Sequence, residues 1–393
     1  MKNRYIEPIW LAQSFIDDLI LIYPVYAIMM MAEGINELEL SVLFVIWALA
    51  SFAFEIPSGV IGDKVDRRFY IFSGTLAGAA GFLSWWLWPT FAGYALGFVL
   101  WSLGSAIHSG TQQSLLYDVL VEQDRTSAFA RIYGRGKAAS SVAVLVAMAL
   151  GGFLAQGGYE PVLLLSALAP FVSGLLVVVL IREPARSGGD GSGDEGPPLS
   201  EALASLRRQP KLRLIALMFI VFAGLPGVID EYIGPLLKDE LAMSLGTIGL
   251  IYGGVLGCQA IGNALAHRLG SVSLQAVGRI SAANHALLAV GLILGLTGLA
   301  AGAPALVIPL CFYFVVMGAV EVLLETGLQN EIEVSARATI TSVTGAGLEI
   351  WVTALFLIVG TLAVRFDWYT ALSAVAIGAV LLSLLLSFVR VAR

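Results

Sequence analysis

The chain has 393 residues, of which 58% are hydrophobic and 13% are charged, and its mean hydropathy is +0.86. Soluble proteins carry about twice this share of charged residues, so the composition excludes a soluble globular protein and indicates a polytopic membrane protein. The net charge of -6 gives no basic patch for nucleic acid, and membrane topology depends on where Lys and Arg lie rather than on net charge.

Twelve apolar segments are long enough to cross a bilayer as helices, each of which needs about 20 residues. They lie at 9–32, 38–62, 69–88, 91–117, 132–155, 160–181, 213–237, 245–267, 275–298, 304–327, 339–364 and 368–390. The widest polar gap contains SGGDGSGDEGPP, which is typical of a flexible linker. We therefore predict an all-α membrane protein with 12 transmembrane helices. It comprises an N-terminal six-helix bundle (1–181), a cytoplasmic linker with a short amphipathic helix (182–212) and a C-terminal six-helix bundle (213–393).

The positive residues give the orientation of these spans. Every Lys and Arg except Lys238 and Arg365 falls on one side of the predicted membrane. Positive residues collect at the cytoplasmic face, so we expect both termini and the linker to be cytoplasmic.

The two halves also share features at a nearly constant spacing. The acidic pair Asp17-Asp18 in span 1 corresponds to Asp230-Glu231 in span 7, and Arg125 after span 4 corresponds to Arg337 after span 10. We therefore predict two pseudo-symmetric bundles that arose from a duplicated six-span unit.

The loop between spans 2 and 3 carries a motif, GVIGDKVDRR, from Gly59 to Arg68. It resembles the signature of the major facilitator superfamily, roughly G-x-x-x-D-R-x-G-R-R. The matches are Gly59, Asp63, Arg67 and Arg68, while Lys64 replaces the usual Arg and Asp66 the usual Gly. The segments FEIPSG and SGTQQSLLYD are similar to a bacterial branch of drug and solute exporters.

The resemblance implies a transporter of the superfamily fold in a bacterial inner (plasma) membrane, with a small-molecule substrate. It also implies roles for the loop residues in conformational gating. Asp63 would pack against the start of span 11, and Arg67 would pair with Asp118 at the inner end of span 4. We expect these contacts to stabilise the outward-open state and to break when the halves rock.

Acidic residues within the spans are the main candidates for binding protons or substrate, because a charge in the hydrocarbon core is costly unless it faces a cavity or a partner. These candidates are Asp17, Asp18, Glu55, Asp230, Glu231, Glu321, Glu325 and Glu349. Asp17 and Asp18 point about 100° apart on a helix, so we expect one in the central cavity and the other against a neighbouring helix.

Two further patterns concern these acids. Glu321 and Glu325 are four residues apart on one helix face, and two such carboxylates resist simultaneous ionisation, which favours a shared proton. The alternative is an ion pair with a base such as Arg135 or Lys137. The AGLPG stretch before Asp230 predicts a break in span 7 that exposes backbone carbonyl groups.

Other polar residues are candidates for the cavity wall. His108 and Gln112 lie one turn apart in span 4, where the alternative is a hydrogen bond between packed helices. Arg135 and Lys137 are candidate bases, where the alternative is a snorkelling anchor at the inner face. Aromatic rings within the spans are candidates for a cavity wall, with simple packing as the alternative: Trp47, Trp101 and Trp351.

No His, Cys or Asp cluster has metal-ligand spacing, and no Walker motif for ATP is present. We therefore expect no enzyme activity, no metal and no cofactor, with energy supplied by a proton gradient. The hypothesis is a proton antiporter that exports a small lipophilic or cationic compound by rocker-switch alternating access. The alternatives are a proton symporter or facilitator that imports a small solute, and a lipid-handling flippase. The expected partners are substrate, protons and the lipid bilayer, with no nucleic acid, and we expect a monomer.

Overall fold

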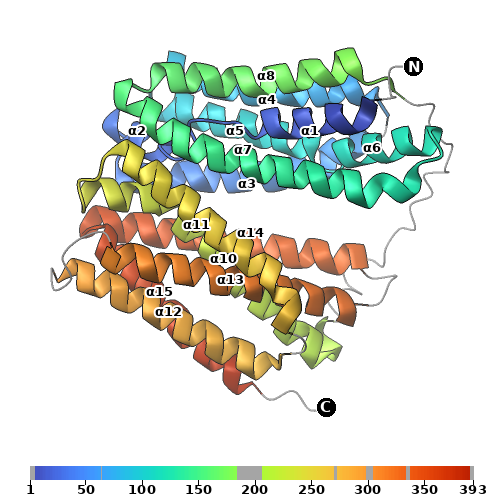
Figure 1. Ribbon diagram of the computed structural model, residues 1–393. Helices are drawn as coiled ribbons and strands as arrows, with labels where there is room; N and C mark the ends of the chain where they lie inside the picture. The colour runs from blue at the N-terminus through green and yellow to red at the C-terminus, as the bar shows by residue number, and fades with distance from the viewer. Residues whose placement is uncertain are drawn as a thin grey trace. The chain divides into compact units, whose positions relative to one another are not determined.

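A computed structural model of the chain describes residues 5–62, 64–183, 206–269, 272–297, 304–332 and 337–389. Within these ranges the secondary structure is helical and contains no strand (Figure 1). Ten of the helical segments are long and apolar enough to cross a membrane. The predicted all-α membrane fold is therefore confirmed. Most of the predicted linker (182–212) lies outside the described residues, which omit 184–205.

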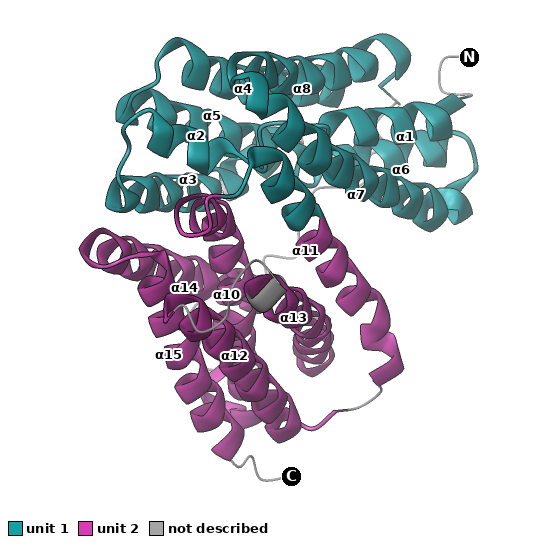
Figure 2. Ribbon diagram, turned by 60° about the vertical axis from the view of Figure 1, so that its left-hand side comes forward, with its two compact units in different colours: residues 1–189, 243–253 teal, residues 190–242, 254–393 magenta. Residues whose placement is uncertain are grey.

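The chain forms two compact units, residues 1–189 with 243–253 and residues 190–242 with 254–393 (Figure 2). The main α-helices of the first are α1 (Ile6–Asp17), α2 (Tyr26–Ala32), α3 (Glu37–Gly62), α4 (Arg67–Leu87), α5 (Phe91–His108), α6 (Thr111–Glu122), α7 (Phe129–Leu154) and α8 (Glu160–Leu180). Those of the second are α10 (Pro210–Asp239), α12 (Leu274–Leu296), α13 (Pro304–Glu331), α14 (Arg337–Arg365) and α15 (Trp368–Phe388). Helix α11 (Leu245–Leu265) begins in the first unit and ends in the second.

The first predicted span, 9–32, is two helices rather than one. Helix α1 ends at Asp17 and α2 begins at Tyr26. Pro24 lies in the gap, and a proline lacks the N–H that an uninterrupted helix would need there. Neighbouring helices support the gap: Ile22 N donates to Ser166 Oγ of α8 at 2.9 Å. A Cβ on Gly151 of α7 would lie 1.8 Å from the Leu21 carbonyl oxygen, so only glycine allows this approach.

We expect Ser166→Ala to destabilise the first unit. Ser166 is fully buried, and its loss leaves the Ile22 N–H without an acceptor, at a cost of about 1–3 kcal/mol. Chemical denaturation in detergent micelles measures this difference. Ser387→Ala is the matched control, because among the described residues the Ser387 hydroxyl bonds only to the Leu384 carbonyl of its own helix. An equal effect of both substitutions would contradict this role of Ser166.

The predicted fourth span, 91–117, is also interrupted. Helix α5 ends at His108 and α6 begins at Thr111. Between them Gly110 has φ +71°, a conformation that glycine adopts at little cost. The two interruptions, in α1–α2 and α5–α6, both occur in the first unit.

The break predicted in span 7 is absent. Helix α10 runs without interruption through Pro226 and Pro235. The prediction was wrong because packing against α14 holds this stretch helical: a Cβ on Gly224 would lie 2.9 Å from Trp351 Cδ1. The Trp351 indole N–H also donates to the Val221 carbonyl at 3.3 Å, which satisfies one backbone group near the proline.

Two groups of buried side chains form the core of the first unit around its helix breaks. An apolar cluster joins α1, α6 and α7 through Ile6, Trp10, Leu116 and Ile132. An aromatic cluster joins α2 to its neighbours through contacts of Tyr26 with Phe44, Trp85, Phe98 and Trp101. Trp10 and Trp101 line the same cavity, so that cavity borders both clusters.

Candidate functional site

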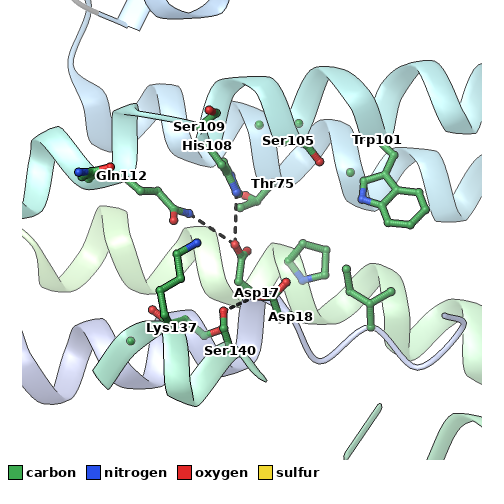
Figure 3. A pocket seen from close by; sticks show the side chains of 18 of the residues that line it. Asp17, Asp18, Thr75, Trp101, Ser105, His108, Ser109, Gln112, Lys137 and Ser140 are labelled. Atoms are coloured by element: carbon green, nitrogen blue, oxygen red, sulfur yellow. Dashed lines mark hydrogen bonds and ion pairs between the residues drawn. The ribbon is translucent and has the colours of Figure 1, made fainter. Parts of the chain in front are cut away.

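A cavity of about 480 Å³ lies within the first unit, at the two helix breaks (Figure 3). Its polar lining includes Asp17 and Asp18 at the end of α1, His108 at the end of α5, Gln112 on α6 and Lys137 on α7. The structure thus brings together five residues that the sequence suggested from separate spans. Its volume lies in the range of small-molecule sites.

Asp17 and His108 form the centre of this site. Asp17 Oδ2 lies 3.3 Å from His108 Nδ1 and accepts a hydrogen bond from Gln112 Nε2 at 3.4 Å. The other imidazole nitrogen, Nε2, lies 3.2 Å from the Ile71 carbonyl oxygen of α4. Because a carbonyl only accepts, Nε2 carries a hydrogen. The contact between Nδ1 and Oδ2 then needs one more proton, held by either partner.

Asp18 faces the same cavity as Asp17, contrary to the expectation that one of them packs against another helix. The expectation assumed an uninterrupted helix, whereas α1 ends at Asp17 and Asp18 is its C-cap residue. Ser140 Oγ of α7 donates a hydrogen bond to Asp18 Oδ2. Sequence reasoning missed Ser140, because a serine on a long apolar helix carries no signal of its own.

The two candidate bases on α7 have different surroundings. Lys137 lines the cavity, where Nζ lies 5.7 Å from the centre of the Tyr133 ring. Arg135 does not line it; its Nη1 pairs with Glu7 Oε1 at 2.5 Å instead. The difference follows from the helical turn, since residues two apart point to nearly opposite faces.

Aromatic rings line the other end of the cavity. Trp101 stacks on Tyr23 with ring centres 5.6 Å apart, and both line the cavity together with Phe82. Trp47 stacks on the Trp101 ring at 5.7 Å. In Figure 3, Trp101 lies across the cavity from Gln112 and Lys137. The sequence suggested Trp101 and Trp47 for the cavity wall, but of these two only Trp101 is among the lining residues. The sequence gave no indication of Tyr23, which the break in span 1 places at the cavity.

The remaining acidic candidates lie elsewhere. Glu55 is exposed on α3 and accepts a hydrogen bond from Ser109 Oγ at 3.0 Å. In the second unit, Glu321 is half-buried on α13 near Gln259, and Glu325 one turn later is exposed. Three further acids of that unit are half-buried: Asp230 and Glu231 on α10, and Glu349 on α14.

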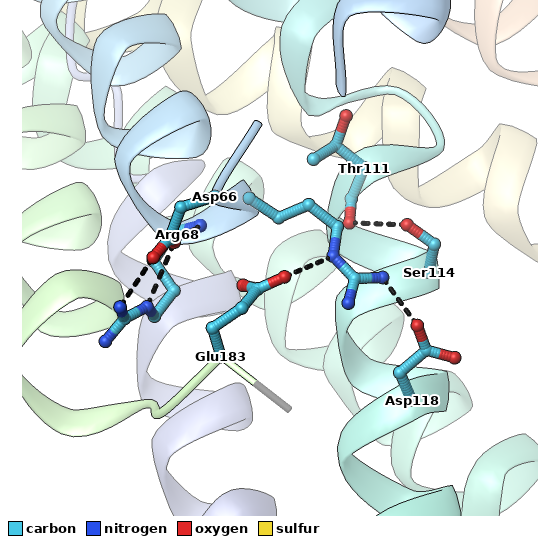
Figure 4. A network of polar contacts seen from close by, with 7 residues as sticks. Asp66, Arg68, Thr111, Ser114, Asp118 and Glu183 are labelled. Carbon is cyan, nitrogen blue, oxygen red and sulfur yellow. Dashed lines mark hydrogen bonds and ion pairs between the residues drawn. The ribbon is translucent and has the colours of Figure 1, made fainter. Parts of the chain in front are cut away.

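The loop motif forms a compact ion-pair network (Figure 4). Arg67 Nη1 lies 2.7 Å from Asp118 Oδ2, as the resemblance implied, and Arg67 Nε lies 2.8 Å from Glu183 Oε1. All three residues belong to the first unit, so Arg67 joins the start of α4 to the end of α6 and to the residues that follow α8 within that unit. This differs from the expectation that the Arg67–Asp118 pair breaks when the two halves rock. Sequence reasoning missed Glu183, whose signal was its position just beyond span 6. Asp63 lies outside the described residues.

Asp66 occupies the position where the superfamily signature usually has glycine, and its backbone conformation does not require one. Its φ of -62° is accessible to any residue, and its side chain caps α4 by accepting from Arg68 N at 3.0 Å. Arg68 also pairs with Asp66 through Nη2 and Oδ2 at 2.6 Å. The hydrogen bonds from Arg68 lower the pKa of Asp66.

We expect Asp66→Ala to lower the free energy of unfolding by about 1 kcal/mol, the usual value of an N-cap. The pKa of Asp66 is lowered in the folded state, so the contribution is present above the unfolded pKa of about 4 and is lost as the pH falls through the folded value. Denaturation at several pH values tests this. The control is Gly59→Ala, where a Cβ meets no described atom within 4 Å; it removes no titratable group, so its effect should not change with pH. An Asp66→Ala effect that does not shrink in acid would contradict the assignment.

Comparisons with known proteins concern the family and the fold of the chain. The sequence model of the Major Facilitator Superfamily matches residues 14–351. A search of curated proteins finds no significant match. A bacterial homologue of the human lysosomal transporter Spinster, inward-facing and unoccupied, superposes with a TM-score of 0.75 and 14% identity over 98% of this chain and 96% of that one. The nucleoside transporter NupG superposes with a TM-score of 0.77 and 12% identity over 98% of both chains.

Proposed function

Because this chain belongs to the Major Facilitator Superfamily, we propose that it is a proton-coupled antiporter that exports a small lipophilic or cationic compound. Membership of this family means that the chain is a membrane transporter with a small-molecule substrate. Coupling to protons and the direction of transport are our inference from the cavity of the first unit.

The contact between Asp17 and His108 is the observation that carries this proposal. One proton is needed between Asp17 Oδ2 and His108 Nδ1 at their separation of 3.3 Å, because Nε2 is engaged with the Ile71 carbonyl. Loss of that proton leaves a carboxylate facing a nitrogen lone pair, which favours separation. Asp17 and His108 end α1 and α5 respectively, so proton occupancy biases the geometry of both helix breaks.

Exchange follows when a bound cationic substrate and a bound proton repel each other within one cavity. A cationic group that enters beside Asp18 adds positive charge next to the Asp17–His108 pair and favours release of its proton. Protonation from the other side of the membrane then reverses the effect. The stacked Trp101 and Tyr23 rings supply an apolar surface for the rest of the compound and a quadrupole that attracts cations.

The proposed mechanism is rocker-switch alternating access between the N-terminal bundle (1–181) and the C-terminal bundle (213–393). Arg67 with Asp118 and Glu183 would act at the cytoplasmic side, where the network fixes the ends of α4 and α6. We propose a monomer in a bacterial inner membrane with both termini and the linker in the cytoplasm.

Everted membrane vesicles test the function. Compounds are first selected by thermal stabilisation of the purified protein at two pH values. Each is then added to vesicles with an acidified interior. We expect the added compound to dissipate the pH gradient in vesicles that contain the protein and not in vesicles that lack it. A protein-dependent flux of the compound that leaves the pH gradient unchanged would contradict coupling to protons. Movement of the compound out of preloaded vesicles, in the same direction as the protons, would indicate symport instead of antiport.

A further inference from the structure

Two opposite charges line the cavity without pairing with each other. Lys137 on α7 and Asp18 at the end of α1 both line it, and neither forms an ion pair with any residue that the structure describes. They are close enough for the Lys137 charge to act on Asp18. An unpaired charge in a partly enclosed site favours a ligand group of opposite sign.

Asp18 differs from Asp17 in being available to a ligand. Asp17 is engaged by His108 and Gln112, whereas within the described part of the chain Asp18 accepts one hydrogen bond, from the neutral Ser140 hydroxyl. A carboxylate has two oxygens and accepts several hydrogen bonds, so Asp18 can bind a cation while Ser140 holds its orientation. Asp17 is left to exchange the proton.

Lys137 is likewise available. Its Nζ lies 5.7 Å from the centre of the Tyr133 ring. The side chain is exposed, and the lysine ammonium has three donors on a flexible stem. By contrast, Arg135 and Arg131 of the same helix are both paired with Glu7. Lys137 is thus the base of this helix segment that can bind an anionic group in the cavity.

We propose that the substrate is a small aromatic zwitterion, with its ammonium group on Asp18, its anionic group on Lys137 and its ring against Trp101 and Tyr23. A molecule with both charges neutralises both side chains, whereas a simple cation leaves Lys137 unpaired. This inference rests on the proposed function, since it names the substrate class of the same cavity. The ammonium group is the part that competes with the proton.

Binding to the purified protein tests the inference with three probes that differ by one charged group. The probes are phenylalanine, 2-phenylethylammonium, which lacks the carboxylate, and 3-phenylpropionate, which lacks the ammonium group. Calorimetric titration at pH 7 gives the three affinities. We expect phenylalanine to bind about tenfold or more tightly than either analogue, the effect of one charge-assisted contact.

Two variants test which side chain binds each charged group of the ligand. Lys137→Met is expected to remove the preference of phenylalanine over 2-phenylethylammonium while leaving 2-phenylethylammonium binding intact, which also shows that the variant is folded. Asp18→Asn is expected to remove the preference of phenylalanine over 3-phenylpropionate. Arg131→Met, on the same helix but outside the cavity lining, is the matched control and should retain both preferences.

The outcomes separate this inference from the proposed function. Equal affinity of the wild-type protein for phenylalanine and 2-phenylethylammonium overturns the zwitterion, as does failure of all three probes to bind. A preference that survives in Lys137→Met also overturns it. If phenylalanine is preferred but no bound compound dissipates a pH gradient, the inference holds and the coupling to protons fails. If simple cations alone dissipate the gradient, the coupling to protons holds and the zwitterion inference fails.

Discussion

Asp17→Asn is expected to abolish substrate-driven proton flux in everted vesicles while substrate exchange continues. Asparagine keeps the size of the side chain and can still meet Gln112, but it cannot take up or release a proton. The contact with His108 at 3.3 Å then becomes a fixed hydrogen bond. Loss of a positioned proton-transfer group lowers rates by about 100-fold or more, so the flux should fall to the background of vesicles without the protein.

Three comparisons make the Asp17 prediction specific. His108→Gln should cause a similar loss, because it removes the second member of the pair. Glu160→Gln, an exposed acid at the start of α8, should leave the flux unchanged. Glu321→Gln tests the half-buried acid of the second unit. If Glu321→Gln abolishes coupling and Asp17→Asn does not, the proton is carried in the second unit and our assignment is wrong.

Arg67→Met should cause the largest loss of stability. The Arg67 side chain is 7% exposed and pairs with Asp118 and Glu183, which are 23% and 16% exposed. Removing the arginine leaves two partly buried carboxylates close together without their cation. Breaking a buried charge pair on one side costs about 3–5 kcal/mol, measurable as a shift in chemical denaturation in detergent micelles.

Arg68→Met is the matched control for this prediction. Arg68 is adjacent in sequence, but it pairs locally with Asp66 and is 21% exposed, so we expect a loss of about 1 kcal/mol or less. Arg67→Lys should fall between the two, because one ammonium group cannot reproduce the separate Nε and Nη1 contacts of the guanidinium. Similar losses for Arg67→Met and Arg68→Met would show that the network does not hold the start of α4 and the end of α6 together.

The fold was predictable because membrane spans leave strong signals in sequence. Long apolar segments and the distribution of Lys and Arg depend on the bilayer rather than on detailed packing. The pairing of Arg67 with Asp118 was also predictable, since the resemblance of the loop motif to the superfamily signature implied it. Glu183 completes that network. Its contact with Arg67 depends on the path of the chain after α8, which hydrophobic periodicity does not predict.

The site was harder to predict because it depends on where helices break. Pro24 lies in the break of span 1 and Gly110 in that of span 4, while Pro226 in α10 leaves the helix intact. Whether a proline interrupts a span depends on the packing around it: Ser166 and Gly151 support the gap before α2, whereas Trp351 supports α10. The acidic pairs Asp17-Asp18 and Asp230-Glu231, which correspond in sequence, therefore differ in structure. The first pair lies at the end of a helix and the second lies inside one.

Proton release on ligand binding is the most direct test of the account. The purified protein, in weakly buffered detergent solution with a pH indicator, is mixed with a saturating amount of the compound that stabilises it most. We predict release of about one proton per protein at neutral pH, as linkage between ligand and proton binding requires, and no release from Asp17→Asn. Binding without proton release by the wild-type protein, or equal release by Asp17→Asn, would contradict the central claim that the Asp17–His108 pair carries the exchanged proton.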